Sequence, residues 1–232
     1  MLLAIAVFAL ASCATHPAAP AISRARTMGE AGLVDIRTRV PDIAEDIRYA
    51  GSDNFVGAPV DGYRAPRCYL LPEAADALAS VERGLRSQGL RLLVFDCYRP
   101  ARAVRHFVRW AQDLSDQRTK ARHYPVLDKR QLLGDYIAPV SGHSRGATVD
   151  LTLLDCSGGH ACAPMDMGTQ FDFFDPRANT ESPLATHAQR QNRQQLKTAM
   201  DAAGFSNYSQ EWWHYTLALV PVPVLLYDVP IE

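Results

Sequence analysis

Residues 141–154 have the sequence SGHSRGATVDLTLL, a glycine-rich stretch followed by an apolar run. The apolar run is typical of a buried strand. On a regular strand, His143 and Asp150 would point to opposite faces because side chains alternate with a period of two. Gly142 and Gly146 permit a curved loop, so we expect His143 on that loop and Asp150 on the strand that follows.

The periodicity of the flanking sequence predicts the other elements. Strands and helices follow one another in irregular order, without a repeated strand-helix-strand unit. This order predicts an α+β fold, a single domain with a central, mainly antiparallel sheet and flanking helices. The predicted strands are Leu33 to Val40, Leu90 to Phe95, Ala147 to Leu154 and Trp212 to Val220, and the predicted helices are Pro72 to Gln88, Pro100 to Asp113 and His187 to Ala203.

The composition is close to that of an average soluble globular protein, with 47% hydrophobic and 21% charged residues in a chain of 232. This length fits one domain with a sizeable core. Lys and Arg number 24 against 25 Asp and Glu, a formal net charge of −1. Without an excess of basic residues, charge gives no reason to expect a nucleic-acid partner or an anionic membrane surface.

The N-terminus has the features of an export signal. Residues 1–12, MLLAIAVFALAS, are almost entirely apolar and too short to span a bilayer. The four residues ending at Cys13 resemble a bacterial lipobox, which predicts that Cys13 is lipidated, and residues 13–30 then form a flexible tether before the domain at 31–232. The protein is therefore expected in the periplasm, touching the membrane only through this lipid anchor. The alternative is a plain signal peptide with an incidental cysteine.

Export also bears on the remaining cysteines, because periplasmic thiols tend to be oxidised. Cys68, Cys97, Cys156 and Cys162 allow three pairings. Cys156 and Cys162 are close enough in sequence to form a local disulfide, which would leave Cys68 with Cys97. The alternative is a metal site that includes His160 between the two later cysteines, although its spacing matches no common zinc pattern.

A second segment with chemical potential is the aromatic run at residues 211–215, EWWHY. Its composition favours a strand, with Glu211 just before the strand begins. His214 is then available as a metal ligand, while Glu211 remains free as a general base. Together with His143 and Asp150, His214 supplies three nitrogen and oxygen ligands, the set that a catalytic zinc ion uses while keeping a fourth position for water. Taken singly, these side chains also fit ordinary hydrogen bonds.

A third segment, residues 95–100 with the sequence FDCYRP, lies where a predicted strand ends and a helix begins. Arg99 would lie near the positive end of that helix, where it could meet negative charge developing on an oxygen atom. The structural alternative is an arginine paired with a surface carboxylate.

In this order, the motifs resemble those of the zinc-dependent D-alanyl-D-alanine dipeptidases, known from vancomycin resistance and from cell-wall dipeptide recycling. The resemblance extends over nearly all of the chain from about Leu33, and it implies a zinc D,D-peptidase (hedgehog-like) fold. The motifs that carry it are Asp53 to Phe55, Pro59 to Tyr63, Tyr98 to Pro100, Ser141 to Leu153, Met167 to Thr169, Phe171 to Phe173 and Glu211 to His214.

The resemblance implies a role for individual residues. It assigns one zinc ion to His143, Asp150 and His214, the general base to Glu211 and transition-state stabilisation to Arg99. The residues that it places around the substrate are Ser141, Asp172 and Tyr49. The implied activity is hydrolysis of D-alanyl-D-alanine to two D-alanines, so the expected partner is a small D-amino-acid dipeptide.

Two other functions stay open at this point. One is a D,D-carboxypeptidase of the same zinc fold that acts on peptidoglycan stem peptides, which would leave Asp172 without an ammonium group to bind. The other is a non-catalytic wall-binding lipoprotein, against which Glu211 and Arg99 argue because binding alone needs neither group. The chain departs from many relatives by having Cys97 where they have glycine, and by its export signal.

Overall fold

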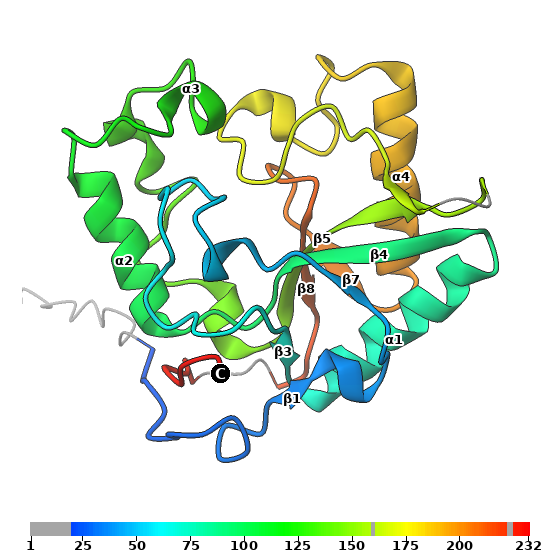
Figure 1. Ribbon diagram of the computed structural model, residues 1–232, viewed down its shortest axis with the longest axis horizontal. Helices are drawn as coiled ribbons and strands as arrows, with labels where there is room; N and C mark the ends of the chain where they lie inside the picture. Colours follow the sequence, from blue (N-terminus) through cyan, green and yellow to red (C-terminus); the bar gives the residue numbers. More distant parts are fainter. Residues whose placement is uncertain (1–19, 159–160, 222–224) are drawn as a thin grey trace, which may run out of the picture.

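The computed structural model describes residues 20–158, 161–221 and 225–232 (Figure 1). Within these ranges the α-helices are α1 (Pro72–Arg86), α2 (Ala101–Gln112), α3 (Lys120–His123) and α4 (His187–Asp201). The strands are β1 (Val34–Asp35), β2 (Ala44–Glu45), β3 (Tyr69–Leu70), β4 (Leu90–Asp96), β5 (Thr148–Asp155), β6 (Ala163–Pro164), β7 (Phe205–Asn207) and β8 (His214–Leu217).

The main sheet has the strand order β2-β4-β5-β8-β7, and β6 pairs with β5 off this path. Only the β2–β4 ladder of this sheet is parallel among the described strands. A separate pair is formed by β1 and β3, which are antiparallel. The predicted α+β fold with a mainly antiparallel sheet is therefore confirmed.

The register of the central strands brings polar residues together. Asp96 on β4 is paired with Asp150 on β5, and Asp150 is paired in turn with His214 on β8. Directly paired residues project their side chains on the same face of a sheet. Three titratable side chains from distant parts of the sequence thus lie side by side at one end of the sheet.

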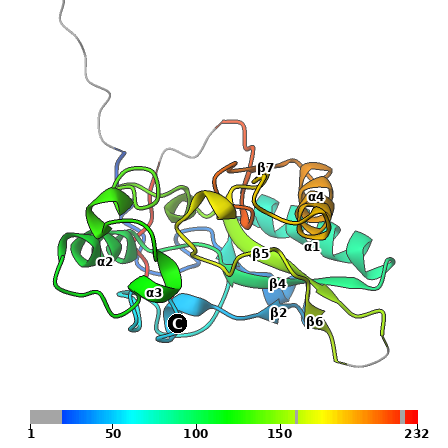
Figure 2. The same cartoon turned by 90° about the horizontal axis from the view of Figure 1, so that it is seen from above.

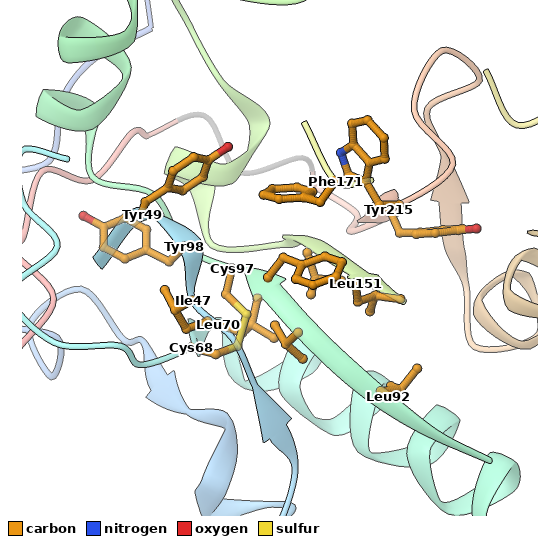
Figure 3. Packing of buried hydrophobic residues seen from close by; sticks show 14 of the residues in the cluster. Ile47, Tyr49, Cys68, Leu70, Leu92, Cys97, Tyr98, Leu151, Phe171 and Tyr215 are labelled. Carbon is orange, nitrogen blue, oxygen red and sulfur yellow. A yellow bond between two sulfur atoms is a disulfide. The ribbon is translucent and has the colours of Figure 1, made fainter. Parts of the chain in front are cut away.

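The helices divide between the two ends of the molecule. α1 contacts β4 and α4, and Figures 1 and 2 show α1 and α4 together at one end, with α2 and α3 at the other. Apolar side chains of the sheet fill the core, and Figure 3 shows Leu151 near Phe171, with Leu92 further along the sheet. The three longer helices begin within one residue of their predicted starts.

The predicted strand Leu33 to Val40 is wrong over most of its length. The chain leaves β1 after two residues and forms a 3₁₀ helix at Ile36–Thr38. The Asp35 side chain accepts a hydrogen bond from the Arg37 main-chain N–H at 2.8 Å, which caps that turn. The alternation of apolar and polar residues in the sequence gives no indication of such a side-chain cap.

The last predicted strand, Trp212 to Val220, is shorter in the structure. β8 begins only at His214, because the preceding residues form a turn. The Asn207 side chain donates to the carbonyls of Glu211 and His214 at 3.1 and 3.0 Å, and these bonds close the turn. Glu211 is therefore held outside the strand, as the sequence predicts.

The two ends of the described chain lie against each other. The Ser23 N–H donates to the Leu226 carbonyl at 2.7 Å, so this part of the predicted tether is paired with the C-terminal segment. Residues 225–232 continue across the domain, where the Tyr227 N–H donates to the Ser144 carbonyl and its carbonyl accepts from the Ala101 N–H. Within the described residues, no helix is long and apolar enough to cross a membrane.

Candidate active site

Three side chains converge at the end of the central sheet. His143 lies on the 3₁₀ turn Gly142–Arg145, Asp150 on β5 and His214 at the start of β8. One nitrogen or oxygen from each lies within 4.8 Å of the others. His143 Nε2 is 3.2 Å from Asp150 Oδ2, and His214 Nδ1 is 3.0 Å from Asp150 Oδ1.

This donor set fits a zinc ion. Asp150 Oδ1 is buried and has no hydrogen-bond partner within the described part of the chain, despite the short distance to His214. His143 Nε2 and His214 Nδ1 also face each other at 3.3 Å. Two imidazole nitrogens and a carboxylate oxygen directed at one point leave lone pairs that a cation satisfies, and nitrogen and oxygen are the donor types that zinc accepts.

The turn that carries His143 depends on its glycines. Gly146 ends the turn with φ 79°, a left-handed conformation in which an L side chain is strained. A Cβ atom at this position would lie 2.5 Å from Leu33 Cδ2. The Ser141 hydroxyl accepts a hydrogen bond from the His143 N–H at 3.3 Å at the start of the same turn. The glycine and serine residues of this motif are thus needed for the backbone path that places the His143 imidazole in the site.

Contacts behind His143 fix its ring. His143 Nδ1 lies 2.7 Å from the Cys97 carbonyl oxygen. A carbonyl can only accept, so Nδ1 carries the proton and Nε2 presents a lone pair toward Asp150. This is the usual arrangement behind a metal-binding histidine.

Arg99 enters the site from the segment before α2. Its Nε donates to Asp96 Oδ2 at 2.9 Å, and its Nη2 lies 3.4 Å from Asp150 Oδ2. The guanidinium also lies over the rings of Tyr49 and Phe107, each 5.0 Å from the ring centroid. Burial opposes the charge of Arg99, but the neighbouring carboxylates of Asp96 and Asp150 keep its pKa well above its ordinary value, so a fixed positive charge lies next to the three converging side chains.

Glu211 lies on the other side of the cluster. Its carboxylate is 3.6 Å from His214 Nδ1 and does not take part in the converging set of three. Burial raises the pKa of Glu211 to about 7, against the opposing effect of His214. A carboxyl group with a pKa near neutrality can both accept and return a proton at physiological pH.

Asp172 and Tyr49 form a buried pair in the same cavity. The Tyr49 hydroxyl lies 3.0 Å from Asp172 Oδ2 and 3.1 Å from Oδ1. Burial, aided by the charge of Asp150, raises the pKa of Asp172 well above its ordinary value. The cavity has a volume of about 310 Å³ and is lined by this pair, by Ser141, by Arg99, by Glu211 and by the three converging side chains.

A family model described as D-ala-D-ala dipeptidase matches residues 29–230 of the chain. The chain belongs to the D-Ala-D-Ala dipeptidase family. Relatives named D-alanyl-D-alanine dipeptidase include one from Streptomyces coelicolor, 44% identical over 83% of this chain and 94% of its own length. Another, from Enterococcus faecium, is 37% identical over 88% of this chain and 100% of its own length. The Escherichia coli relative is 32% identical, covering 84% of this chain and 90% of the relative.

A solved vancomycin-resistance D,D-pentapeptidase in complex with Zn(II) has a distant likeness to this member of the dipeptidase family. The match covers 70% of this chain and 79% of the other, with 13% identity and a TM-score of 0.39.

The sequence predicts most of the cavity residues of this dipeptidase-family chain, but two buried residues that support the cavity were not predicted. Asp96 is completely buried and accepts hydrogen bonds from Arg99 and from the Tyr63 hydroxyl, the latter at 2.6 Å. It lies inside the quoted 95–100 motif, which was the available signal. His123, whose Nδ1 lies 2.8 Å from the Asp172 carbonyl, had no such signal because it belongs to no motif.

The cysteines of this family member form two disulfides. Cys68 is bonded to Cys97 with Cα atoms 5.2 Å apart, and Cys156 to Cys162 with Cα atoms 4.3 Å apart. The alternative metal site at Cys156 and Cys162 is wrong because both thiols are used in a bond. His160 and Cys13 lie outside the described residues.

Proposed function

We propose that this protein is a zinc metallopeptidase that hydrolyses D-alanyl-D-alanine to two molecules of D-alanine. The observation that carries the proposal is the convergence of His143, Asp150 and His214 beside Glu211 and Arg99 in one cavity. Membership of the D-Ala-D-Ala dipeptidase family supports the choice of substrate.

His143, Asp150 and His214 would hold the zinc ion, which, when bound, lowers the pKa of water and polarises a carbonyl group. Glu211 then accepts a proton from the attacking water, as its raised pKa allows. The Arg99 guanidinium stabilises the negative charge that develops on the substrate carbonyl oxygen. Glu211 finally returns the proton to the leaving amine, so that its carboxyl group ends in its starting state.

The Asp172–Tyr49 pair supports recognition of a free amino terminus. A buried carboxylate without a positively charged partner is unfavourable, which the raised pKa of Asp172 expresses. A substrate ammonium group would supply that partner, with Tyr49 orienting the carboxylate and Ser141 at the rim meeting the rest of the dipeptide. This contact selects a dipeptide over a longer peptide whose corresponding nitrogen is an amide.

A comparison of three substrates tests the assignment. Zinc-loaded protein is incubated separately with D-alanyl-D-alanine, with the N-acetylated dipeptide and with a stem pentapeptide, and released D-alanine is quantified. Rapid release from the free dipeptide alone supports the proposal. Equal release from the pentapeptide would assign the protein to the D,D-carboxypeptidases, and no release from any substrate would assign it a binding role.

We also propose that the protein acts in the periplasm and is anchored there through lipidated Cys13. The apolar residues 1–12 support export, as does the presence of two disulfides, which persist in oxidising compartments. Labelling of cells with a palmitate analogue, followed by fractionation, tests both parts. A Cys13→Ser chain that still carries the label would overturn the anchor site.

A further inference from the structure

The carbonyl of Cys97 is the main-chain group that fixes the His143 imidazole, at 2.7 Å from Nδ1. Its position therefore decides where His143 Nε2 points. Two residues later in the chain, Arg99 enters the same cavity. An interaction that holds Cys97 in place therefore affects the positions of both the His143 imidazole and the Arg99 side chain.

Cys97 lies at the point where the regular sheet pairing of this segment ends. β4 ends at Asp96, and its pairing with β5 is already irregular between Val94 and Asp96. Beyond β4, the Tyr98 N–H donates to the Tyr69 carbonyl at 2.9 Å, and the Arg99 N–H reaches the His143 carbonyl at 3.3 Å. The peptide group that carries the Cys97 carbonyl is thus held through its own N–H by Tyr69, the neighbour of Cys68, although regular strand pairing has ended.

The disulfide to Cys68 supplies a covalent hold at this point, and Figure 3 shows the bridge among buried side chains. Cys68 and Cys97 are 0% and 2% exposed. The Cys68 end is itself anchored, because its N–H donates to Glu45 Oε1 at 3.2 Å and its carbonyl accepts from the Ile36 N–H at 3.0 Å. The bridge therefore connects the segment behind His143 to a firmly held part of the domain.

We propose that the Cys68–Cys97 disulfide is a positioning element for the metal centre, which sets zinc affinity by fixing the Cys97 carbonyl behind His143. The inference rests on the proposed zinc site and extends it to residues outside the cavity. Partners behind a metal-binding histidine typically change metal affinity by about 10-fold to 100-fold when they are lost. Cutting the bridge is therefore expected to weaken zinc binding about tenfold or more.

The second disulfide provides a matched control within the same chain. Cys156 follows β5, and its N–H donates to the Gly89 carbonyl at 2.8 Å, next to the start of β4. It thus lies at the end of β4 opposite to Cys97. Removing the Cys156–Cys162 bridge should change zinc affinity by less than about twofold, since nothing in this bridge touches the metal ligands.

The test compares zinc affinity, measured by competition with a chromophoric chelator, at a temperature where circular dichroism shows each protein folded. The variants are Cys68→Ala with Cys97→Ala, a volume-restoring pair of Cys68→Ala with Cys97→Val, and Cys156→Ala with Cys162→Ala. We expect weaker zinc binding in the first two and native binding in the third. Native affinity in a folded variant without the Cys68–Cys97 bridge would overturn the proposal, as would an equal loss in the control.

A measurement on the unaltered protein keeps the proposal testable if neither bridge variant folds. In the metal-free native protein, the ring Nδ1–H of His143 should give a nuclear magnetic resonance signal that exchanges slowly with water. Exchange as fast as that of an exposed histidine would refute the fixed carbonyl contact. Because zinc affinity and ring exchange are read without substrate, a protein that binds zinc as expected but cleaves no dipeptide would refute the proposed function alone.

Discussion

Glu211 and His214 are three residues apart but occupy different structural contexts. His214 on β8 is paired with Asp150 on the neighbouring strand β5, whereas Glu211 lies on the turn before β8. This separation keeps the Glu211 carboxylate close to the cluster without making it one of the three converging ligands. A proton carrier must remain uncoordinated to exchange its proton, and the turn provides that freedom.

Glu211→Gln should therefore lower kcat by about 10² to 10⁴-fold, the usual contribution of a general acid-base group. Glutamine keeps the shape of the side chain but cannot take up the proton. Zinc content, measured by elemental analysis, should stay at one ion per chain. Loss of the metal from this variant would identify Glu211 as a ligand instead.

Asp172 is suited to a conservative test because its backbone has φ 56°. Asparagine tolerates this left-handed conformation, so Asp172→Asn removes the charge and keeps the fold. For the free dipeptide, kcat/KM should fall by roughly 30-fold or more, since losing one partner of a buried charge pair costs about 2 to 5 kcal/mol. The rate on the N-acetylated dipeptide should change much less. Parallel assays of both substrates give the ratio, and an unchanged ratio would contradict the ammonium contact.

At the scale of elements, α2 obtains its N-terminal cap from a distant part of the chain. Pro100 at the cap position has no side-chain hydrogen bond to offer. Asp228 of the C-terminal segment caps the helix instead, because its Oδ1 accepts a hydrogen bond from the Arg102 N–H at 2.7 Å. A carboxylate at this end of a helix is favoured by the free N–H groups and by the helix dipole.

Asp228→Ala should lower the free energy of unfolding by about 1 kcal/mol, the typical effect of losing a capping side chain. Partial burial raises the pKa of Asp228, but hydrogen bonds from Arg102 and Arg105 outweigh this and hold it below its ordinary value. A depressed carboxyl pKa stabilises the fold above the unfolded-state value of about 4, and this contribution is lost as the pH falls further. Urea titrations at pH 7 and pH 3 should show the difference between native and variant shrinking at the lower pH. An equal difference at both values would contradict the ionic cap.

Gly146 makes the turn of the metal ligand sensitive to a single methyl group. Gly146→Ala should destabilise the fold by about 2 kcal/mol or more, because left-handed backbone strain adds to the clash with Leu33. Gly84→Ala in α1 is the control, since a Cβ there meets nothing within 4 Å and alanine favours a helix by about 0.5 to 1 kcal/mol. Thermal melts of both variants should move in opposite directions. A Gly146→Ala protein as stable as the native one would show that the turn is not constrained.

The same elements show which structural features a sequence predicts well. α1, α2 and α4 were predictable because each has a long apolar period and a clear start at proline or threonine. β1 was not, since a side-chain cap from Asp35 redirected an alternating segment into a 3₁₀ turn. Local hydrogen bonds of this kind compete with strand pairing and leave no periodic signal.

For the whole molecule, the sequence predicts which residues meet in the cavity but not what supports them. The ligand candidates were recognisable from residue type and from the family resemblance. Asp96, His123 and the Asp228 cap depend on contacts between segments far apart in sequence, which no local pattern reports. The predicted strand and helix positions constrain the fold class, whereas the paired register of Asp96, Asp150 and His214 requires the assembled sheet.

The path of the C-terminal segment has a consequence for the order of events during synthesis. Tyr227 bonds both to the Ser144 carbonyl, on the turn of His143, and to the Ala101 N–H, just after Arg99. A growing chain that has been synthesised as far as β8 already contains every residue of the cavity. The Tyr227 contacts, which join the turn of His143 to the start of α2, have not yet formed at that stage. The cavity is therefore expected to reach its final arrangement only after residues 225–232 have been synthesised.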